Sequence, residues 1–211
     1  MKLISLNVAM PQLVSYKGRE DYTSIFKLPV EGERKVSTLN IEGDAQSDLS
    51  VHGGEFKAVY AYDISYYQHW KNILPRDDWG YGLFGENLTT ENLPDHEICV
   101  GNIYQVGSVH LMAVQPRFPC FKLNIKFGTE QMVKQFVQQA KHGTYFSVVR
   151  PGSLQPGDAI KLLQASRHKI TIQQLVDSFY NRESDRRTLD EILAIDVLPP
   201  RLRKSFESFT H

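Results

Sequence analysis

Cysteine is scarce in this chain, with only Cys99 and Cys120 among 211 residues. Two cysteines are too few for a disulfide scaffold, and their spacing is not one that a zinc site uses. Such a sequence is typical of a reducing compartment, so we expect a cytoplasmic protein. Each cysteine is therefore judged as a single thiol.

Charge imbalance and long apolar runs are also missing. The 24 basic and 24 acidic side chains leave a formal net charge of zero, which argues against a general nucleic-acid or membrane surface. No apolar run approaches the roughly 20 residues of a membrane-spanning helix. The first nine residues carry one positive charge and a short apolar run broken by Asn7, which predicts a first strand and not a signal peptide.

Short strand patterns separated by turn signals dominate the chain up to residue 165. Strands at such close spacing predict an antiparallel sheet or barrel and not repeated β–α–β units. One helix is predicted from Ser65 to about Leu74, capped by Asp63, and another from Gln131 to His142. The strand candidates are 3–9 and 13–16 as a hairpin, then 23–28, 36–41, 57–62, two strands between 98 and 114, 145–149 and 159–163.

The composition changes after residue 166. Thr171 and Gln174 form a capping-box pattern ahead of an amphipathic helix, and two further helices are predicted over 185–195 and from about residue 200. We therefore expect a strand-rich domain over residues 1–165 and a three-helix extension over residues 166–211. The extension is too small to bury much surface alone, so it should dock on the first domain or on the second subunit of a homodimer.

Cys120 follows two predicted strands and comes directly after Pro119. Because proline cannot continue a central strand, the cysteine should lie at the rigid end of a strand, where its side chain can face a cleft. Arg117 and Lys122 are close in sequence, and a helix that starts here would also favour the thiolate. A lone cysteine is more often a buried apolar filler, which is our interpretation of Cys99.

Several separated motifs occur in a fixed order along the chain. They are Gly43-Asp44 with Asp48, His52-Gly53-Gly54, Lys57-Ala58-Val59-Tyr60 with Tyr62, Phe84-Gly85-Glu86-Asn87-Leu88, Gly101, Gln115-Pro116-Arg117 and Pro119-Cys120 with Lys122. Together they resemble the MOSC family, the molybdenum-cofactor sulfurase C-terminal type of domain, and its stand-alone bacterial YiiM branch in particular. The likeness spans most of residues 1–165, and the helical tail resembles the three-helix extension of that branch.

The resemblance implies a fold that is mainly β with helices, a MOSC-type β-barrel followed by a small three-helix C-terminal appendage. It also implies a molybdenum cofactor (molybdopterin), with Cys120 as the thiolate ligand of the metal, and the family carries an association with pyridoxal phosphate binding. The branch is linked to the reductive detoxification of N-hydroxylated bases such as 6-hydroxylaminopurine, with a separate flavoprotein reductase as electron donor. We therefore expect a molybdenum-dependent oxidoreductase that acts on a small N-hydroxylated substrate.

The chemistry of the residues agrees with this expectation. A metal held by sulfur favours a soft thiolate, and Cys120 is the better placed of the two cysteines. The phosphate of a pterin cofactor needs cationic donors, for which Lys57, Arg117 and Lys122 are the candidates. A second set of basic residues consists of Lys17, Arg19 and Lys27.

Several polar residues have two open interpretations. His52 is a candidate for proton delivery to the N–O bond, because imidazole titrates near neutral pH, and the alternative is a ring that stabilises its own loop. Asn87 is a candidate cofactor-binding residue, and both Asn87 and Glu86 have loop bracing as the alternative. Asp44 and Asp48 are expected to brace their loop by accepting hydrogen bonds from turn N–H groups.

Two other functions stay open beside the enzyme. The protein could be a non-catalytic molybdenum-cofactor or sulfur carrier that uses the thiol of Cys120 as a persulfide or a docking group. The third hypothesis is a thiol hydrolase with Cys120 as nucleophile and His52 as base, and we rank it last because it lacks a residue that orients the base.

Overall fold

A computed structural model describes residues 1–47, 53–181 and 185–209 of the chain. In this part of the chain the strands are β1 (Lys2–Val8), β2 (Gln12–Tyr16), β3 (Arg19–Thr23), β4 (Leu28–Val30), β5 (Arg34–Val36), β6 (Val59–Asp63), β7 (Leu88–Glu91), β8 (Ile103–Val106), β9 (Val109–Pro116), β10 (Thr144–Arg150), β11 (Gly152–Leu154) and β12 (Ile160–Gln164). The helices are α1 (Ile64–Lys71), α2 (Phe121–Phe127), α3 (Met132–Gln139), α4 (Ile172–Asn181), α5 (Arg186–Leu193) and α6 (Pro200–Glu207), with a 3-10 turn at Glu55–Lys57.

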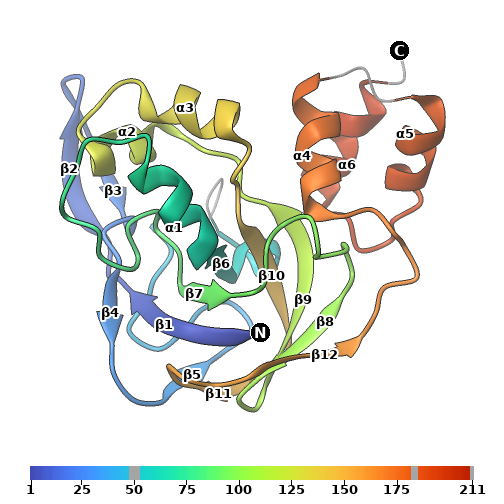
Figure 1. Cartoon of the computed structure of the whole chain (residues 1–211), viewed down its shortest axis with the longest axis horizontal. Helices are drawn as coiled ribbons and strands as arrows, with labels where there is room; N and C mark the ends of the chain where they lie inside the picture. The colour runs from blue at the N-terminus through green and yellow to red at the C-terminus, as the bar shows by residue number, and fades with distance from the viewer. Residues whose placement is uncertain (48–52, 182–184, 210–211) are drawn as a thin grey trace.

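Eight strands form one curved sheet in the order β12-β8-β9-β10-β6-β7-β1-β4 (Figure 1). Pairing is antiparallel except between β6 and β7, which are parallel and are connected through α1. The predicted antiparallel sheet is therefore confirmed, but the sequence analysis missed one β–α–β connection. It was missed because two of the buried residues of β7 are Thr89 and Thr90, so the short strand carries no apolar alternation.

The sheet is not closed into a barrel, which corrects that part of the expected fold. One edge of β1 is shared between two partners. Leu6, Asn7 and Val8 pair with β4, so only the first residues of β1 can meet β12, the strand at the other end of the sheet. There the contact is limited to a bridge between Lys2 and Ala159 and a few backbone hydrogen bonds, such as Ile160 N–H to the Met1 carbonyl at 3.0 Å. A short β4 on the shared edge thus prevents continuous closure.

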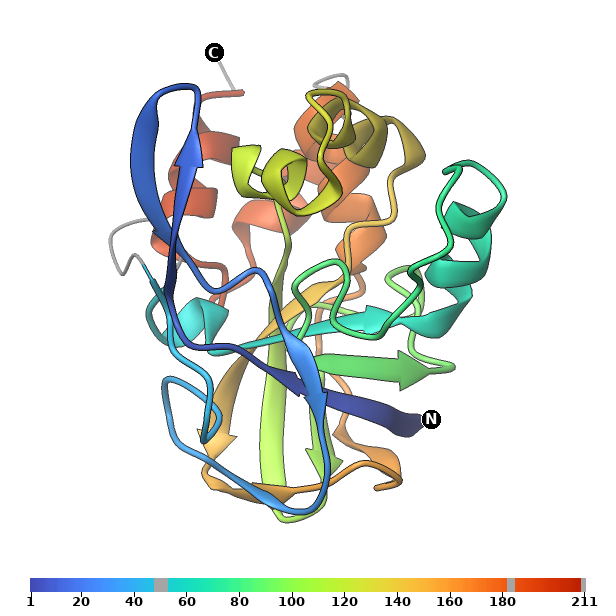
Figure 2. The same cartoon turned by 90° about the vertical axis from the view of Figure 1, so that its left-hand side faces the viewer.

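The predicted hairpin of residues 3–9 and 13–16 does not form. β2 instead pairs with β3 across a turn at Lys17 and Gly18, whose positive φ angles of 53° and 74° are those of a tight two-residue hairpin. This β2–β3 hairpin stands beside α2 (Figure 2), where the ring of Tyr16 stacks on Phe121 with a centroid distance of 5.4 Å. The hairpin therefore leans on the helix that Cys120 begins.

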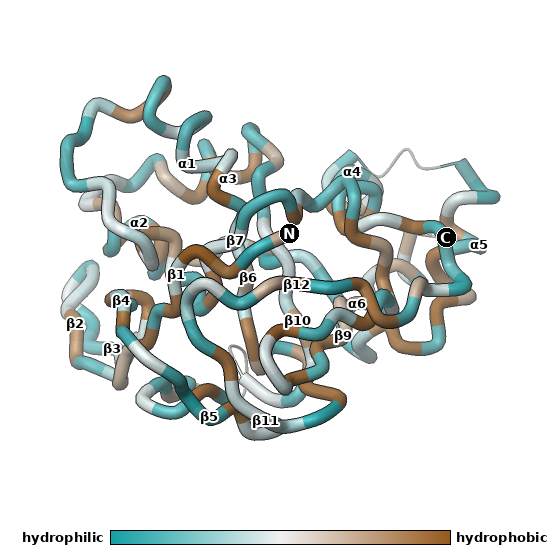
Figure 3. The backbone as a smooth tube through the Cα atoms, turned by 60° about the horizontal axis from the view of Figure 1, so that its bottom comes forward, coloured by the Kyte–Doolittle hydropathy of each residue, from teal (hydrophilic) through white to brown (hydrophobic). Residues whose placement is uncertain are grey.

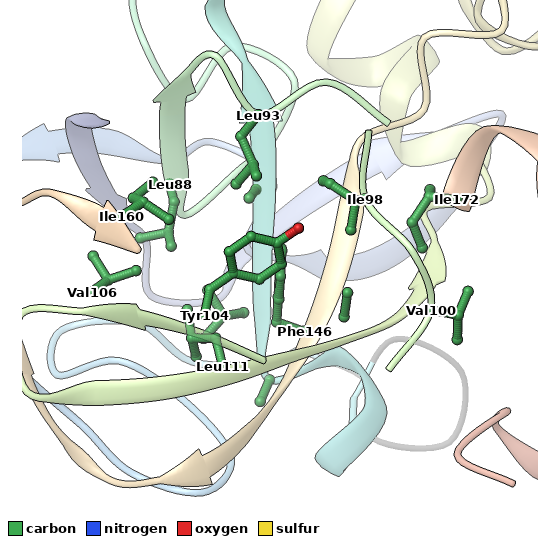
Figure 4. Close-up of a cluster of buried hydrophobic side chains, with 14 of the residues drawn as sticks. Leu88, Leu93, Ile98, Val100, Tyr104, Val106, Leu111, Phe146, Ile160 and Ile172 are labelled. Carbon is green, nitrogen blue, oxygen red and sulfur yellow. The ribbon is translucent and has the colours of Figure 1, made fainter. Parts of the chain in front are cut away.

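Two groups of buried side chains support these elements. The larger one fills the concave side of the sheet, where Tyr104, Leu111 and Phe146 come together (Figure 4). The smaller one is aromatic and lies between α1, α3 and the loop before β7, with Trp70 stacked on Phe136 at 6.0 Å. This second group backs the segment that leads to Cys120.

The three C-terminal helices dock on the sheet domain of the same chain. Ile172 N–H donates to the Ile98 carbonyl at 2.9 Å, and Ile172 belongs to the main apolar cluster. The capping box is confirmed, because Thr171 and Gln174 each donate a backbone N–H to the other's side chain, at 2.8 and 3.1 Å. Hydrophobic and hydrophilic segments alternate along α4 and α5 (Figure 3), as amphipathic helices require. The homodimer and the domain limits stay predictions.

Among the described residues, no helix combines the length and the apolar character needed to cross a membrane.

Candidate functional site

Cys120 lies where β9 has ended and α2 begins. It is the N-cap residue of α2, with an extended backbone at φ −131° and ψ 174°, and its carbonyl accepts the Leu123 N–H at 2.9 Å. Its thiol is a half-buried free cysteine that lines two neighbouring clefts. Cys99 is also half-buried, but it lines neither cleft. The placement at a strand end facing a cleft is the one that the proline predicted.

The two clefts meet at four shared residues: Lys57, Phe118, Cys120 and Tyr145. The first, here called the cationic cleft, has a volume of about 100 Å³. Its other charged and amide-bearing lining residues are Lys27, Asp44, Gln46, Asn87, Arg117 and Lys122. The second, here called the helix-facing cleft, has a volume of about 530 Å³. Its other lining residues are Gly53, Phe56, Gln115, Pro116, Phe179, Pro199, Pro200, Arg201, Leu202 and Ser205.

Arg117 is a buried cation that is held from several sides. Its Nη1 donates to the Phe84 carbonyl at 2.9 Å, and its guanidinium carbon lies 5.2 Å from the ring centre of Tyr60 and 5.4 Å from that of Phe136. Burial opposes its charge, but the side chains of Tyr60 and Tyr145 favour the charged form, and the pKa of Arg117 is raised from its ordinary value. A permanent positive charge therefore lines the cationic cleft.

The backbone of Arg117 is fixed by the segment before β10. Its N–H donates to the Gly143 carbonyl at 3.1 Å, and Nδ1 of the fully buried His142 lies 2.8 Å from its carbonyl oxygen. Asp95, also buried, accepts the Gly143 N–H at 2.8 Å and the Thr144 hydroxyl at 3.1 Å. Burial raises the pKa of Asp95 to about 6 and lowers that of His142 to about 4.

Lys57 ends the 3-10 turn and lines both clefts beside Cys120. Its pKa is lowered, first by burial and then by the positive charge of Arg201 on α6. The turn follows Gly54, whose φ of 86° suits glycine. Lys57 and Arg201 therefore bring two positive charges from distant parts of the sequence to the same space.

Lys122 is committed to the β2–β3 hairpin. Its Nζ donates to the Tyr22 carbonyl at 2.6 Å and lies 3.4 Å from Oδ2 of Asp21. Its side chain is buried and lines the cationic cleft, but these contacts give it a structural task that the sequence did not indicate.

A buried polar network forms the far wall of the cationic cleft. The ammonium of Lys27 pairs with Oδ1 of Asp44, which also accepts the Ala9 N–H at 2.8 Å. Asn87 Nδ2 donates to Oδ2 of Asp44 at 2.9 Å, and its Oδ1 accepts the Tyr60 N–H at 3.1 Å. Burial lowers the pKa of Lys27 despite its carboxylate partner. Asn87 thus braces the strands and lines the cleft at the same time.

Glu86 braces the glycine loop that packs against this wall. It is fully buried and accepts hydrogen bonds from Gly82 N–H at 2.9 Å, Phe84 N–H at 3.1 Å and the hydroxyl groups of Thr89 and Tyr67. Burial raises its pKa, while these donors act in the opposite direction. Gly82 is required, because a Cβ there would lie 2.7 Å from the Lys27 carbonyl oxygen at a φ of 79°. Bracing accounts for every contact that Glu86 makes here.

The remaining predicted residues lie elsewhere. Lys17 pairs with Glu130 at 2.8 Å on the exposed hairpin, so it does not join Lys27 in a second cationic cluster. His52 and Asp48 fall outside the described residues, and their roles stay predictions. The site roles of Cys120, Lys57, Asn87, Arg117 and Lys122 stay predictions as well, although all five line the same cleft.

Sequence reasoning missed Tyr145 and Arg201, which line the clefts from β10 and α6. Tyr145 sits in a predicted strand whose pattern explains it without a function. Arg201 lies in the part of the chain that was interpreted as structural, and no local motif marks it.

A molybdenum cofactor fits this set of residues. The described residues contain no group of three or more His, Cys, Asp and Glu side chains able to hold a metal ion. A thiolate suits a metal held by sulfur, and Arg117 and Lys57 supply positive charge for an anionic cofactor. The geometry does not test the association with pyridoxal phosphate.

Known proteins match this chain over most of its length. The family model described as MOSC domain matches residues 48–161, and the one described as YiiM-like, 3-alpha helix domain matches residues 170–208. The Bacillus subtilis (strain 168) protein named "Uncharacterized protein YflK" is 34% identical over 204 residues, which cover 97% of this chain and 92% of that protein. A Gibberella moniliformis protein named "Reductase" is 30% identical over 203 residues, which cover 92% of this chain but only 36% of the longer relative.

The fold agrees with a solved structure over its whole length. The crystal structure of YiiM from Geobacillus stearothermophilus matches with a TM-score of 0.83 and 26% identity, and the match covers 100% of this chain and 99% of that one. The chain therefore belongs to the MOSC domain family, with a C-terminal part that matches the YiiM-like 3-alpha helix domain.

Proposed function

We propose that this protein is a molybdenum-cofactor-dependent reductase of N-hydroxylated compounds such as 6-hydroxylaminopurine. The observation that carries the proposal is the position of Cys120, a half-buried thiol at the junction of a cationic cleft and a larger, more apolar one. Membership of the MOSC domain family and the name "Reductase" of one relative support the redox class. The cytoplasm is part of the proposal, because a thiol that must stay reduced suits a reducing compartment.

In this proposal six residues of the cationic cleft have defined tasks. Cys120 offers a thiolate ligand to the metal, while Arg117 and Lys57 hold the anionic part of the cofactor by charge-assisted hydrogen bonds. The bound cofactor supplies two-electron redox chemistry. The Lys27–Asp44–Asn87 network keeps the opposite wall rigid, so that the cofactor meets a preformed surface.

The overall reaction reduces the substrate and oxidises an electron donor. A hydroxylamine R–NH–OH takes up two electrons and two protons, its N–O bond breaks, and R–NH₂ and water leave. His52 is proposed as the proton donor, because imidazole titrates near neutral pH. We propose a separate flavoprotein as the electron donor.

Metal content and turnover test the proposal together. Protein made in a host that synthesises the molybdenum cofactor should carry molybdenum in a molar amount proportional to that of the protein. It should also reduce 6-hydroxylaminopurine when a flavoprotein donor is supplied. Cys120→Ser should lose both properties, whereas Cys99→Ser, a matched change of the other thiol, should keep both. The readouts are metal analysis by mass spectrometry and chromatography of the amine product.

Each of the other outcomes favours a different function for this protein. Molybdenum without turnover would favour a cofactor carrier, and a persulfide on Cys120 would favour a sulfur carrier. Hydrolysis without metal that iodoacetamide stops would favour a thiol hydrolase. Absence of molybdenum from protein made in that host would overturn the proposal.

A further inference from the structure

The helix-facing cleft lies between the end of the sheet and the C-terminal helices. Pro116 and Phe118 come from the segment around the end of β9, while Phe179 comes from α4 and Pro200 and Leu202 come from α6. Its volume of about 530 Å³ falls in the range of small-molecule sites, which are mostly apolar with a few polar groups. Aromatic and proline side chains on facing walls suit a planar ring system.

The Lys, Arg, Asp and Glu side chains that line this cleft within the described residues are all basic. Lys57 and Arg201 line it, and the described lining residues include no aspartate or glutamate. The two charges affect each other, because Arg201 contributes to the lowered pKa of Lys57. A positive charge that lines a cleft attracts an anionic ligand to it.

Arg201 differs from its neighbour on α6. Arg203 donates to the carbonyl groups of Leu193 and Ile195 and so ties α6 to the end of α5. Arg201 is exposed at the cleft, and its guanidinium makes no hydrogen bond or ion pair within the part of the chain that the structure describes. Its donors are therefore available to a ligand, whereas those of Arg203 are used by the fold.

We propose that Arg201 is a specificity-determining residue that selects planar substrates with an anionic group, either a carboxylate or a phosphate. The C-terminal helices then form part of the substrate site. The ring packs against the pair formed by Phe118 and Phe179, whose ring centres lie 4.4 Å apart, and against Pro200 of α6. The N-hydroxylated end points toward Cys120, and the anionic end meets Arg201. This inference rests on the proposed function for the identity of the reacting end but not for the charge preference.

A pair of ligands that differ by one phosphate group tests the inference. Adenosine and adenosine 5′-monophosphate are the amine products expected from 6-hydroxylaminopurine riboside and its 5′-monophosphate. Titration calorimetry on the full chain should show tighter binding of the monophosphate. Arg201→Gln should weaken it about 10-fold and leave adenosine within about 2-fold, as for loss of one charge-assisted hydrogen bond.

The matched control is Lys204→Gln, which removes the same charge from the same helix at an exposed position that lines neither cleft. It should leave both affinities unchanged. With the hydroxylated pair as substrates, Arg201→Gln should raise KM for the monophosphate only and keep kcat.

Equal binding of the two ligands by the unmodified protein, or equal losses in Arg201→Gln and Lys204→Gln, would overturn the inference. Binding is measured without turnover. A protein that fails to reduce either substrate but still binds the monophosphate more tightly would therefore contradict the proposed function and support the anion site at Arg201.

Discussion

The two clefts that meet at Cys120 use positive charge in different ways. In the cationic cleft Lys27 pairs with Asp44, Lys122 holds the β2–β3 hairpin and Arg117 donates to the Phe84 carbonyl. In the helix-facing cleft Arg201 makes no such bond to the described chain. Under the proposed function, this difference suits one fixed ligand in the first cleft and exchanging ligands in the second. Changes in the first should alter stability, and changes in the second should alter only binding.

The largest effect is expected for Asp44→Asn. It leaves the buried ammonium of Lys27 without its carboxylate, and breaking a buried ion pair in this way costs about 3–5 kcal/mol of unfolding free energy. Urea unfolding at pH 7 measures the loss. Glu130→Gln removes the carboxylate of the exposed pair with Lys17 and should leave the unfolding midpoint unchanged.

Arg201→Gln should also leave that midpoint unchanged. A loss of stability in this variant as large as that of Asp44→Asn would break the comparison between the clefts.

The second prediction concerns the pH dependence of the unfolding free energy, as set by Asp95 and His142 in the segments that fix the backbone of Arg117. The raised pKa of Asp95, about 6, contributes stability that is present at low pH and is lost as pH rises through 6. The lowered pKa of His142, about 4, contributes stability that is present above its unfolded value of about 6.5 and is lost as pH falls through 4. Between pH 4 and 6 the two contributions have opposite slopes and nearly cancel.

Single substitutions should reveal each slope. In Asp95→Asn the unfolding free energy should rise by roughly 3 kcal/mol from pH 4 to 6.5, because only the histidine remains. In His142→Gln it should fall by a similar amount over the same interval. Urea unfolding at three pH values within this interval measures both, and parallel curves for the two variants would contradict the assignment.

The smallest effect is expected for Lys122→Met, which keeps a side chain of similar length but removes the hydrogen bond to Tyr22 and the ion pair with Asp21. The loss should be about 1 kcal/mol, the net value of one hydrogen bond, and should be local. Hydrogen exchange should speed up in β2 and β3 and stay unchanged in β9 and β10. Lys134→Met, an exposed change on α3, is the control. Faster exchange throughout the sheet would show that Lys122 supports more than the hairpin.

Local chemistry made part of this structure predictable. The proline before Cys120 correctly predicted that the strand ends ahead of the cysteine, since β9 ends at Pro116. Thr171 with Gln174 marked the start of α4, because each signal acts within a few residues. Strand pairing was harder. β1 pairs with β7, whose buried threonines hide it from a hydrophobic pattern, so the predicted hairpin of 3–9 with 13–16 was wrong.

The candidate site shows the same division. Lys57, Asn87, Arg117 and Lys122 were proposed from motifs, and all line the cleft beside Cys120. Their individual contacts depend on packing between distant segments, and no sequence pattern indicated that Lys122 holds a hairpin or that Asn87 joins Asp44. Arg201 reaches the site only because α6 lines the same cleft as the end of β9, so its charge could not be assigned from the helix alone.

The shared edge of β1 has a consequence for the order of folding. Leu6 pairs with Val30 and Leu88, and Lys2 bridges to Ala159. The pairing of β1 is therefore complete only when segments spread over most of the chain have come together. Closing such long loops makes assembly slow, on the order of milliseconds to seconds for sheets dominated by distant pairings. The C-terminal helices contain mainly local contacts and form sooner. Their apolar faces, however, can pack against the sheet domain only after the sheet is complete. We therefore expect the docking of α4 to α6, and with it the helix-facing cleft, to be the last step of folding.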